Sequence, residues 1–342
     1  PPKRHHTKGG LQNLHFLCPC SIVVFVVHSF FIYSIMMSVM LMKEGRHMET
    51  TRDINVSVAG NDSNRLANGK EYMEKENRII MLGTGSATVS RCYNTCFVVE
   101  SGSDRLMVDA GGGNGILGQL SKAGVAIDDI HHLFVTHAHT DHVLGVVWVV
   151  RVIMQHVLEK RYDGVLHVYG NGKVVDVITA ICGMTLHKKY NALIGSEILF
   201  HRLADGDGFQ VGTMDVKCFD IHSKKEPQYG FSLRFGNGER LVCMGDEPCS
   251  EQTLQHAAGA DWMMCEAFCL YADRERFRPY EKFHSTALDA GTMAEKTGVR
   301  NLIVYHTEDT DLAHRKERYT EEVKENFSGN VFVPDDLEVI KL

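Results

Sequence analysis

The sequence has little of the positive charge pattern that binds nucleic acid. Its 36 Lys and Arg residues are outnumbered by 43 Asp and Glu residues, and the formal net charge is −7 at pH 7. No stripe of Lys and Arg interleaved with aromatic residues follows the chain, as it would on a surface that tracks a phosphate backbone. Short basic stretches at 223–226 (SKKE) and 273–278 (DRERFR) fall near predicted site loops and read as solvated loops. The composition excludes a general nucleic-acid binder and favours an enzyme.

A cysteine pattern typical of disulfide frameworks is also missing. Several of the ten cysteines lie inside apolar runs such as LVCMG (241–245) and WMMCEA (262–267), where a free thiol behaves as a small hydrophobic group. The spacings Cys92-x-x-x-Cys96 and Cys265-x-x-x-Cys269 lack the Gly and Lys turn residues that flank a zinc ribbon. Scattered reduced cysteines predict a cytoplasmic protein.

Formal charge is absent from residues 21–42 (SIVVFVVHSFFIYSIMMSVMLM), a stretch long enough to cross a bilayer. Lys and Arg flank it on both sides, so charge does not choose an orientation. Residues 43–77 are polar and read as a linker. Two interpretations of residues 1–77 stay open: a membrane tether or signal peptide, and upstream sequence that is not part of the functional protein. The catalytic domain is predicted over residues 78–342.

What the chain does contain is a dense set of metal-capable side chains in FVTHAHTDHVLG, residues 134–145. The set follows an apolar run that reads as a strand and precedes one long enough for a helix. Imidazoles and carboxylates are zinc ligands, and alternate positions of an extended turn allow His137 and His139 to share one ion. Asp141 and His142 come as the helix begins and can hold a second ion. A two-metal site is predicted.

This H-x-H-x-D-H pattern resembles the signature of the metallo-β-lactamase fold superfamily. Upstream, RLMVDAGGG (105–113) is similar to the family strand that ends in an aspartate, here Asp109, which in relatives orients a ligand histidine. Downstream, the runs CFDIHS, LVCMGDEP and NLIVYHTED each place a His or Asp directly after apolar residues. The resemblance implies two divalent ions, Zn²⁺ or Mn²⁺. It implies that one is bound by His137, His139 and His222, the other by Asp141, His142 and His306, and that Asp246 bridges them.

Two further segments resemble ribonuclease Z and its phosphodiesterase relatives. The first is RIIMLGTGSATVSRCYNTCFVVE (78–100), and the second is EKFHSTALDAGTMAEKTGVRNLIVYH (281–306), which carries the HST segment with His284 in the catalytic position. Glu266 matches the acidic residue that pairs with this histidine in relatives. The resemblance implies a phosphodiesterase of small-molecule or nucleotide-like esters and a homodimer. A hydroxide held between the ions would attack, Asp141 and Glu266 would assist, and His284 would act as general acid.

One part of the ribonuclease Z pattern is absent. In the tRNA-processing enzymes a long flexible arm that grips the tRNA elbow is inserted between the third histidine motif and the bridging aspartate. Between His222 and Asp246 this chain holds only SKKEPQYGFSLRFGNGERLVCMG, which reads as two strands and a hairpin turn. Processing of tRNA 3′ ends is therefore not predicted, whereas phosphodiester or ester hydrolysis stays open.

The order of elements predicts an α/β fold, the four-layer αββα sandwich of the metallo-β-lactamase type, with the metal ligands on loops at one edge of the two sheets. Residues 155–200 are expected to shape the substrate pocket, Tyr169 among them. The predicted strands cover 78–82, 95–100, 104–109, 131–136, 197–203, 209–221, 229–235 and 240–245, and the predicted helices cover 114–123 and 143–158.

Three other functions were weighed against the phosphodiesterase. A carboxyl ester, lactone or thioester hydrolase would use the same metals without needing His284. A flavodiiron-type oxygen reductase would carry Glu where this chain has His139, and a flavin domain, which this chain lacks. A catalytically silent binding module would have lost a ligand, whereas all seven are present here. The ester hydrolase is the alternative retained, and tethering through residues 21–42 is the alternative to a cytoplasmic location.

Overall fold

Residues 76–342 are the part of the chain that the computed structural model describes. They form two seven-stranded sheets with helices on the outer side of each. The predicted apolar segment 21–42 and almost all of the predicted linker lie outside the described residues.

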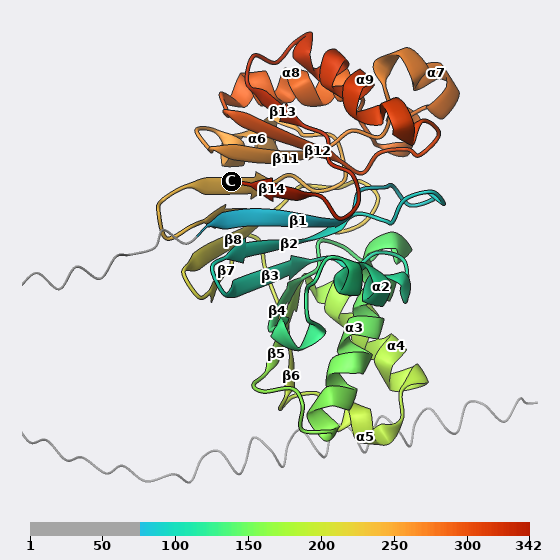
Figure 1. Ribbon diagram of the computed structural model, residues 1–342, viewed down its shortest axis with the longest axis vertical. Coiled ribbons are helices and arrows are strands. Elements are labelled where there is room, and N and C mark those ends of the chain that lie inside the picture. Colours follow the sequence, from blue (N-terminus) through green and yellow to red (C-terminus); the bar gives the residue numbers. More distant parts are fainter. Residues whose placement is uncertain (1–75) are drawn as a thin grey trace, which may run out of the picture. The chain divides into compact units, whose positions relative to one another are not determined.

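The first sheet has the strand order β14-β1-β2-β3-β4-β5-β6. Strands β1, β2, β3 and β14 pair antiparallel, whereas β3 to β6 run parallel. Parallel neighbours need crossover connections, and helices supply them on the outer face of the sheet (Figure 1). The strands are β1 (Asn77–Gly83), β2 (Cys96–Ser101), β3 (Asp104–Val108), β4 (His132–Phe134), β5 (Leu166–Gly170), β6 (Ile198–Arg202) and β14 (Val339–Lys341). The helices are α2 (Gly115–Lys122), α3 (Thr140–Leu158), α4 (Gly172–Thr185) and α5 (Lys188–Asn191).

The second sheet has the order β13-β12-β11-β10-β9-β8-β7. Its last strands, β10 to β13, run parallel and are connected by helices that cover the outer face (Figure 1). The strands are β7 (Gly208–Val211), β8 (Met214–Asp220), β9 (Tyr229–Arg234), β10 (Arg240–Cys243), β11 (Trp262–Glu266), β12 (Asn301–Tyr305) and β13 (Asn330–Phe332). The helices are α6 (Glu251–Ala257), α7 (Arg274–Phe277), α8 (Ala287–Thr297) and α9 (Leu312–Lys324).

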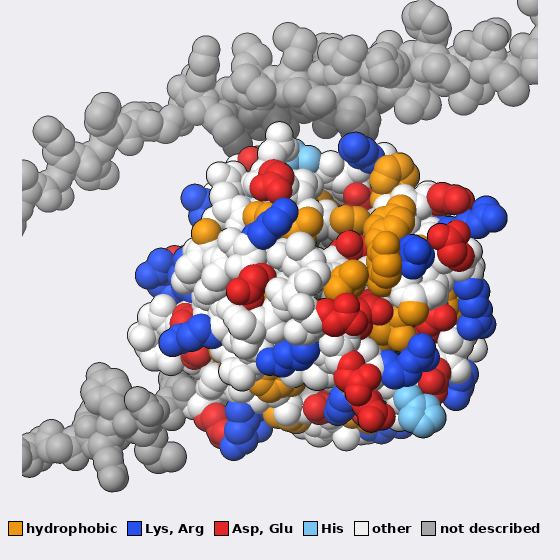
Figure 2. Space-filling view, turned by 90° about the horizontal axis from the view of Figure 1, so that it is seen from above, with side chains coloured by type: hydrophobic (Ala, Val, Ile, Leu, Met, Phe, Trp, Pro, Cys, Tyr) orange, Lys and Arg blue, Asp and Glu red, His pale blue; other side chains and the backbone are white. Residues whose placement is uncertain are grey.

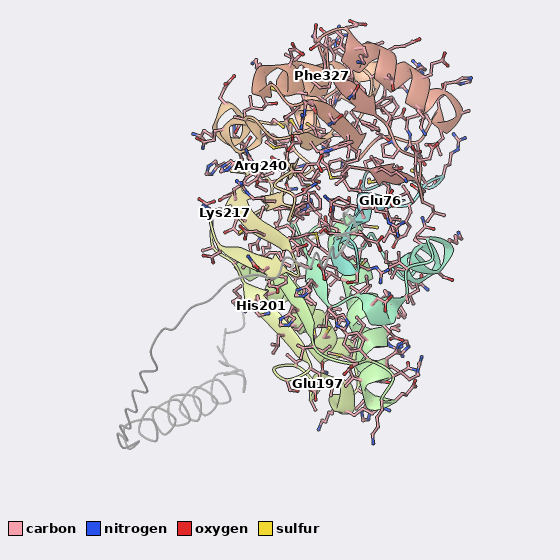
Figure 3. All side chains as sticks on the ribbon, turned by 60° about the vertical axis from the view of Figure 1, so that its left-hand side comes forward. Glu76, Glu197, His201, Lys217, Arg240 and Phe327 are labelled. Atoms are coloured by element: carbon pink, nitrogen blue, oxygen red, sulfur yellow. The ribbon has the colours of Figure 1, made fainter. Side chains whose placement is uncertain are left out.

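Alternating strand residues create three hydrophobic layers. Side chains such as Phe97, Phe134 and Phe231 pack between the two sheets, and separate clusters lie under the helices of each sheet. Figure 3 shows side chains filling the unit between Glu197, at the end beside the first sheet's helices, and Phe327, in the helical layer over the second sheet. The predicted four-layer αββα sandwich is confirmed.

Two expectations from the sequence were wrong, one about a strand and one about a pocket residue. The run 209–221 is not one strand, because the chain reverses between β7 and β8 at Gly212, whose φ is +55°. This left-handed backbone favours glycine, and a Cβ there would also have to displace the Asp104 carboxylate, whose carbon lies 2.0 Å from that position. Tyr169, expected in the pocket, packs between the sheets instead, with its ring stacked 3.8 Å from that of Phe209.

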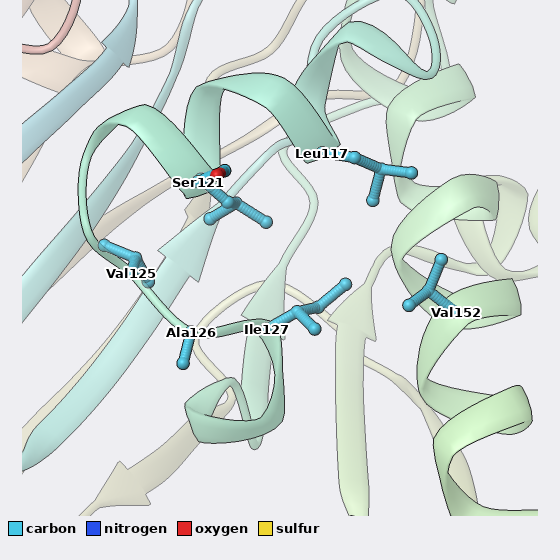
Figure 4. Close-up of a pocket in the computed structure, with 7 residues that line it drawn as sticks. Leu117, Ser121, Val125, Ala126, Ile127 and Val152 are labelled. Carbon is cyan, nitrogen blue, oxygen red and sulfur yellow. The ribbon is translucent and has the colours of Figure 1, made fainter.

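Helix α3 is the one described helix that is long and apolar enough to cross a membrane. It is instead a core helix of the first sheet, since half of its apolar window is buried and residues such as Val146 and Val150 are fully covered. A pocket of about 320 Å³ lies between α2 and α3, lined by residues such as Leu117, Ser121 and Val152 (Figure 4). The pocket contains none of the predicted metal ligands.

The cysteines of the described residues behave as the sequence predicted. All are free, and all but Cys92 are buried. The groups of metal-capable side chains found among residues 76–342 contain no cysteine.

Candidate metal centre

The candidate ligands are brought together where strands of both sheets end. Asp109 follows β3, the His137 to His142 turn follows β4, and Asp246 and His306 follow β10 and β12. Asp109 and His306 have φ angles of +54° and +60°, a left-handed backbone that is uncommon for residues other than glycine. These turns leave the strands abruptly, so that short side chains meet at one edge.

The first group of ligand atoms comes from His137, His139 and Asp246. One nitrogen or oxygen of each lies within 4.8 Å of the other two. His137 Nε2 is 2.8 Å from His139 Nδ1 and 3.5 Å from Asp246 Oδ2. His137 is fully buried and His139 is partly exposed. This group can hold one ion.

The second group comes from Asp141, His142 and His306, all of them buried. Asp141 Oδ2 lies 3.3 Å from His142 Nε2 and 3.6 Å from His306 Nε2. Asp246 Oδ2 is also 3.7 Å from His142 Nε2 and 3.6 Å from His306 Nε2. Because the same Asp246 oxygen reaches both groups, it lies where a bridging ligand would.

Asp109 and Thr136 orient the two central histidines. Asp109 accepts hydrogen bonds from the Thr136 backbone N–H and hydroxyl, both at 2.8 Å, and its Oδ2 lies 2.8 Å from His142 Nδ1. The Thr136 hydroxyl also lies 3.0 Å from His137 Nδ1. Both imidazoles thus use Nδ1–H as a donor and present Nε2 to the site. The resemblance indicated Asp109 for this role but not Thr136, whose only signal in the sequence is a hydroxyl directly before His137.

Gly145 lets helix α3 approach the Asp109 turn. Its backbone N–H donates to Gly111 O at 2.8 Å, and a Cβ at this position would lie 1.8 Å from Ala110 O. Any side chain would therefore push the first turn of α3, with Asp141 and His142, away from Asp109.

Several buried polar atoms of the two groups have no hydrogen-bond partner. They are His142 Nε2, Asp246 Oδ1 and both ring nitrogens of His306. Leaving such atoms unpaired costs roughly 1–3 kcal/mol each, and a cluster of them is typical of a site that binds a ligand. Nitrogen and carboxylate oxygen atoms that converge in this way fit divalent zinc or manganese.

The charge states of His137 and Asp246 suit ligation, whereas the Asp141 and Asp109 carboxylates outweigh burial and raise the pKa of His142 well above its ordinary value, so this ring must release a proton when it binds a metal. Burial lowers the pKa of His137 well below its ordinary value, which keeps the ring neutral. Burial by itself raises the pKa of Asp246, but the imidazoles of His137, His306 and His142 outweigh it and hold that pKa well below its usual range. A neutral imidazole and an ionised carboxylate are the forms that bind metals.

A third group, Glu266, His284 and His306, adjoins the second. His284 Nδ1 lies 3.6 Å from Glu266 Oε2, and neither atom has a hydrogen-bond partner. Glu266 Oε1 accepts the Ser285 backbone N–H at 2.6 Å, which fixes the carboxylate. The His284 ring stacks on Phe268 at 5.0 Å and lies 5.2 Å from the His306 ring. Phe268 carried no signal in the sequence.

His222 is a predicted ligand that does not lie in either group of converging ligand atoms in the structure. It ends the turn after β8 with a φ of +59°, its side chain is 55% exposed, and its Nδ1 lies 3.9 Å from Asp220 Oδ2. Among the described residues, the groups of atoms within 4.8 Å of one another do not include it. The imidazole of His222 lies on an exposed loop, on the side of Asp220 rather than among the other ligands. Its ligand role stays a prediction.

A pocket of about 350 Å³ lies between the loop after Asp109 and helices α3 and α4, and its lining contains none of the candidate ligands. Gly112 and Gly113 of the loop after Asp109 line one side, and Leu144, Trp148 and Ile181 line the other. Thr185 and Leu186 also line this pocket, and the role of residues 155–200 in shaping a substrate pocket stays a prediction.

Comparisons with known proteins agree with this geometry. The family model described as Anti-Pycsar protein Apyc1 matches residues 77–321. Ribonuclease Z of Bradyrhizobium sp. (strain ORS 278) is 24% identical over 277 residues, which cover 67% of this chain and 88% of the relative.

Solved structures show the same fold. The metallo-β-lactamase fold protein YhfI from Bacillus subtilis superimposes with a TM-score of 0.64 at 16% identity, covering 78% of this chain and 100% of the other. The short form of human tRNase Z superimposes with a TM-score of 0.60 at 20% identity, covering 77% of this chain and 98% of the other. The predicted ribonuclease Z-like resemblance is confirmed.

Proposed function

Because this chain belongs to the Anti-Pycsar protein Apyc1 family and has the metallo-β-lactamase fold, we propose that it hydrolyses phosphodiesters with two divalent ions. It is a metal-dependent hydrolase, as the sequence predicted. The observation that carries the phosphodiesterase proposal is the position of His284, held between Phe268, Glu266 and His306 beside the second ligand group.

The residues that would hold the ions are the two groups described above, joined by Asp246 and completed by His222. When bound, two divalent ions lower the pKa of water and offset the negative charge of a phosphate ester. The protein's own contribution is orientation: Asp109 and Thr136 fix the imidazoles, so that their Nε2 atoms converge before any ligand arrives.

His284 would supply the proton that the leaving alkoxide needs. Hydrolysis adds water across a P–O bond and releases an alcohol, which is a poor leaving group unless it is protonated as it departs. Glu266 Oε2 lies 3.6 Å from His284 Nδ1, so a small ring rotation would form a hydrogen bond that orients the imidazole. The other ring nitrogen would then donate to substrate. A lactone or thioester does not need this donor.

The segment between His222 and Asp246 favours small substrates. It contains only β9, β10 and the turn around Gly238, with φ of +91°, and these two strands pair antiparallel. A substrate must therefore be recognised by the loops around the centre itself.

Substitution of His222 tests whether this residue helps to bind the ion of the first ligand group. His222→Ala should reduce bound zinc or manganese from about two ions to about one per protomer, because an ion held by only two protein side chains and a shared carboxylate binds weakly. Elemental analysis of protein purified without chelator measures this. His314→Ala is the matched control, since His314 is an exposed histidine that pairs with Asp311. Unchanged metal content in His222→Ala would remove His222 from the ligand set.

A substrate panel tests the proposed reaction. The zinc- or manganese-loaded enzyme should hydrolyse bis(p-nitrophenyl) phosphate and a dinucleoside phosphate with a higher kcat/KM than a lactone, a thioester or a β-lactam. Chelation with EDTA should abolish the phosphodiesterase activity, and added zinc or manganese should restore it. A lactone or thioester turned over faster than every phosphodiester would instead support the carboxyl ester alternative.

A further inference from the structure

Two cysteine side chains lie in contact on the outer side of the second sheet. Cys249 Sγ is 3.5 Å from Cys265 Sγ, and both residues are buried free thiols. Cys249 lies in the loop between β10 and α6, and Cys265 lies in β11. Between residues 76 and 342 these are the two cysteines whose sulfur atoms are in hydrogen-bonding contact. Because a disulfide joins its sulfur atoms at about 2 Å, two thiols this close need only a small movement to form one.

A pocket of about 160 Å³ gives access to the pair. Both cysteines line it, together with Pro248, Tyr280, Ser285, Asp289, Ala290 and Met293. The last three belong to α8, in the helical layer that Figure 2 views from outside, where hydrophobic side chains are exposed among charged ones. Tyr280 is 51% exposed, so one wall of the pocket lies at the surface. A water molecule occupies about 30 Å³, so an oxidant as small as hydrogen peroxide fits.

Cys249 is the more accessible of the two thiols. Its residue is 8% exposed, whereas Cys265 is 1% exposed. The hydrogen bond with Cys249 and burial also raise the pKa of Cys265 well above its ordinary value. Because the thiolate rather than the thiol attacks an oxidant, Cys249 is expected to react first and Cys265 second.

Cys265 is held in place, whereas Cys249 belongs to the loop that carries Asp246. Strand β11 pairs with β10 on one side and with β12 on the other. Cys249 comes three residues after Asp246. Between them, Glu247 accepts a hydrogen bond from the Ser223 hydroxyl at 2.5 Å. A bond between the two sulfurs would therefore move the loop of Asp246 rather than β11.

We propose that Cys249 and Cys265 form a dithiol modification site, in which a peroxide oxidises the pair to a disulfide. The Cys249 sulfur attacks one oxygen of hydrogen peroxide, the O–O bond breaks, and a sulfenic acid and water form. The Cys265 sulfur then attacks the Cys249 sulfur, and the hydroxyl leaves as water with the proton of the Cys265 thiol. Two thiols are oxidised and one peroxide is reduced to two waters. The disulfide displaces the Asp246 loop and lowers turnover.

The first test maps the disulfide and does not depend on the proposed function. The full chain is reduced, freed of reductant and treated with hydrogen peroxide, and the remaining thiols are then blocked. Cleavage before aspartate separates Cys249, in 246–260, from Cys265, in 261–272. Wild type should give these two peptides joined, with fragmentation placing the link at Cys265 rather than Cys269, and reduction should separate them. Free thiols at both positions, or a Cys249 sulfinic acid beside a free Cys265, would overturn the site.

Three variants identify the thiols that react. Cys249→Ser and Cys265→Ala each remove one partner and should give no joined peptides. Cys92→Ser is the matched control, because Cys92 is the one cysteine of residues 76–342 that is not buried, and this variant should form the disulfide as wild type does. Joined peptides in Cys249→Ser, or none in Cys92→Ser, would assign the reaction to other thiols.

The second test measures turnover and rests on the proposed phosphodiesterase function. Hydrolysis of bis(p-nitrophenyl) phosphate by oxidised wild type should fall severalfold and return after reduction with a phosphine. Cys249→Ser should keep its rate through the same treatment. Unchanged turnover in chains that hold the disulfide would overturn its effect on the Asp246 loop. If reduced wild type hydrolyses no phosphodiester, the proposed function fails, while the joined peptides still decide the dithiol site.

Discussion

Asp246→Asn will lower phosphodiester turnover by roughly a thousandfold or more, the largest effect expected of any single substitution in this chain. The carboxylate reaches three histidines through one oxygen, at 3.5, 3.6 and 3.7 Å, so it belongs to both ligand groups at once. An amide keeps the shape but loses the negative charge. Both ions should therefore bind more weakly, and elemental analysis should find less metal than in wild type.

The control for this variant is Asp215→Asn, which removes an exposed carboxylate from the start of β8 without touching the centre. It should retain wild-type metal content and turnover. Thermal melting of both variants with and without zinc completes the comparison, because metal that binds the folded state stabilises it. Wild-type activity and metal content in Asp246→Asn would mean that the two groups do not work as one centre.

His284→Ala will slow a dinucleoside phosphate by about a hundred- to ten-thousandfold, the range typical of general acid catalysis. Bis(p-nitrophenyl) phosphate should lose far less activity, because p-nitrophenolate departs without a proton. Metal content should not change, since His284 is not a proposed ligand. Steady-state kcat values for both substrates, measured beside elemental analysis, decide the point.

Glu266→Gln is the companion variant, because it removes the charge that lies 3.6 Å from His284 Nδ1 while Gln can still accept the Ser285 N–H. It should reproduce the substrate dependence of His284→Ala with a smaller loss. Equal losses on both substrates in His284→Ala, or a loss of metal, would argue that the ring supports the ligand group rather than protonating the leaving group.

The sequence by itself determined the order of the strands that carry the site. Asp109, His137, Asp246 and His306 each come just after an apolar run, and a buried strand that ends in a polar residue is a local pattern, readable without knowing its neighbours. The local sequence pattern also predicted that Asp141 and His142 lie at the start of a helix, and α3 does begin at Thr140. The four-layer fold followed from alternating strands and helices together with the resemblance.

Only the tertiary structure decided which side chains meet. That one Asp246 oxygen reaches both ligand groups, that Thr136 orients His137, and that Phe268 stacks on His284 are contacts between distant segments, set by how the sheets pack. The turn at Gly212 lies beside the Asp104 carboxylate, more than a hundred residues away in sequence, which accepts a hydrogen bond from the Thr213 backbone N–H. The local pattern predicted that His222 follows a strand, but it did not predict that the ring would lie 3.9 Å from Asp220 on an exposed loop. Strand patterns follow from nearest-neighbour chemistry, whereas distances between side chains follow from packing that no single segment contains.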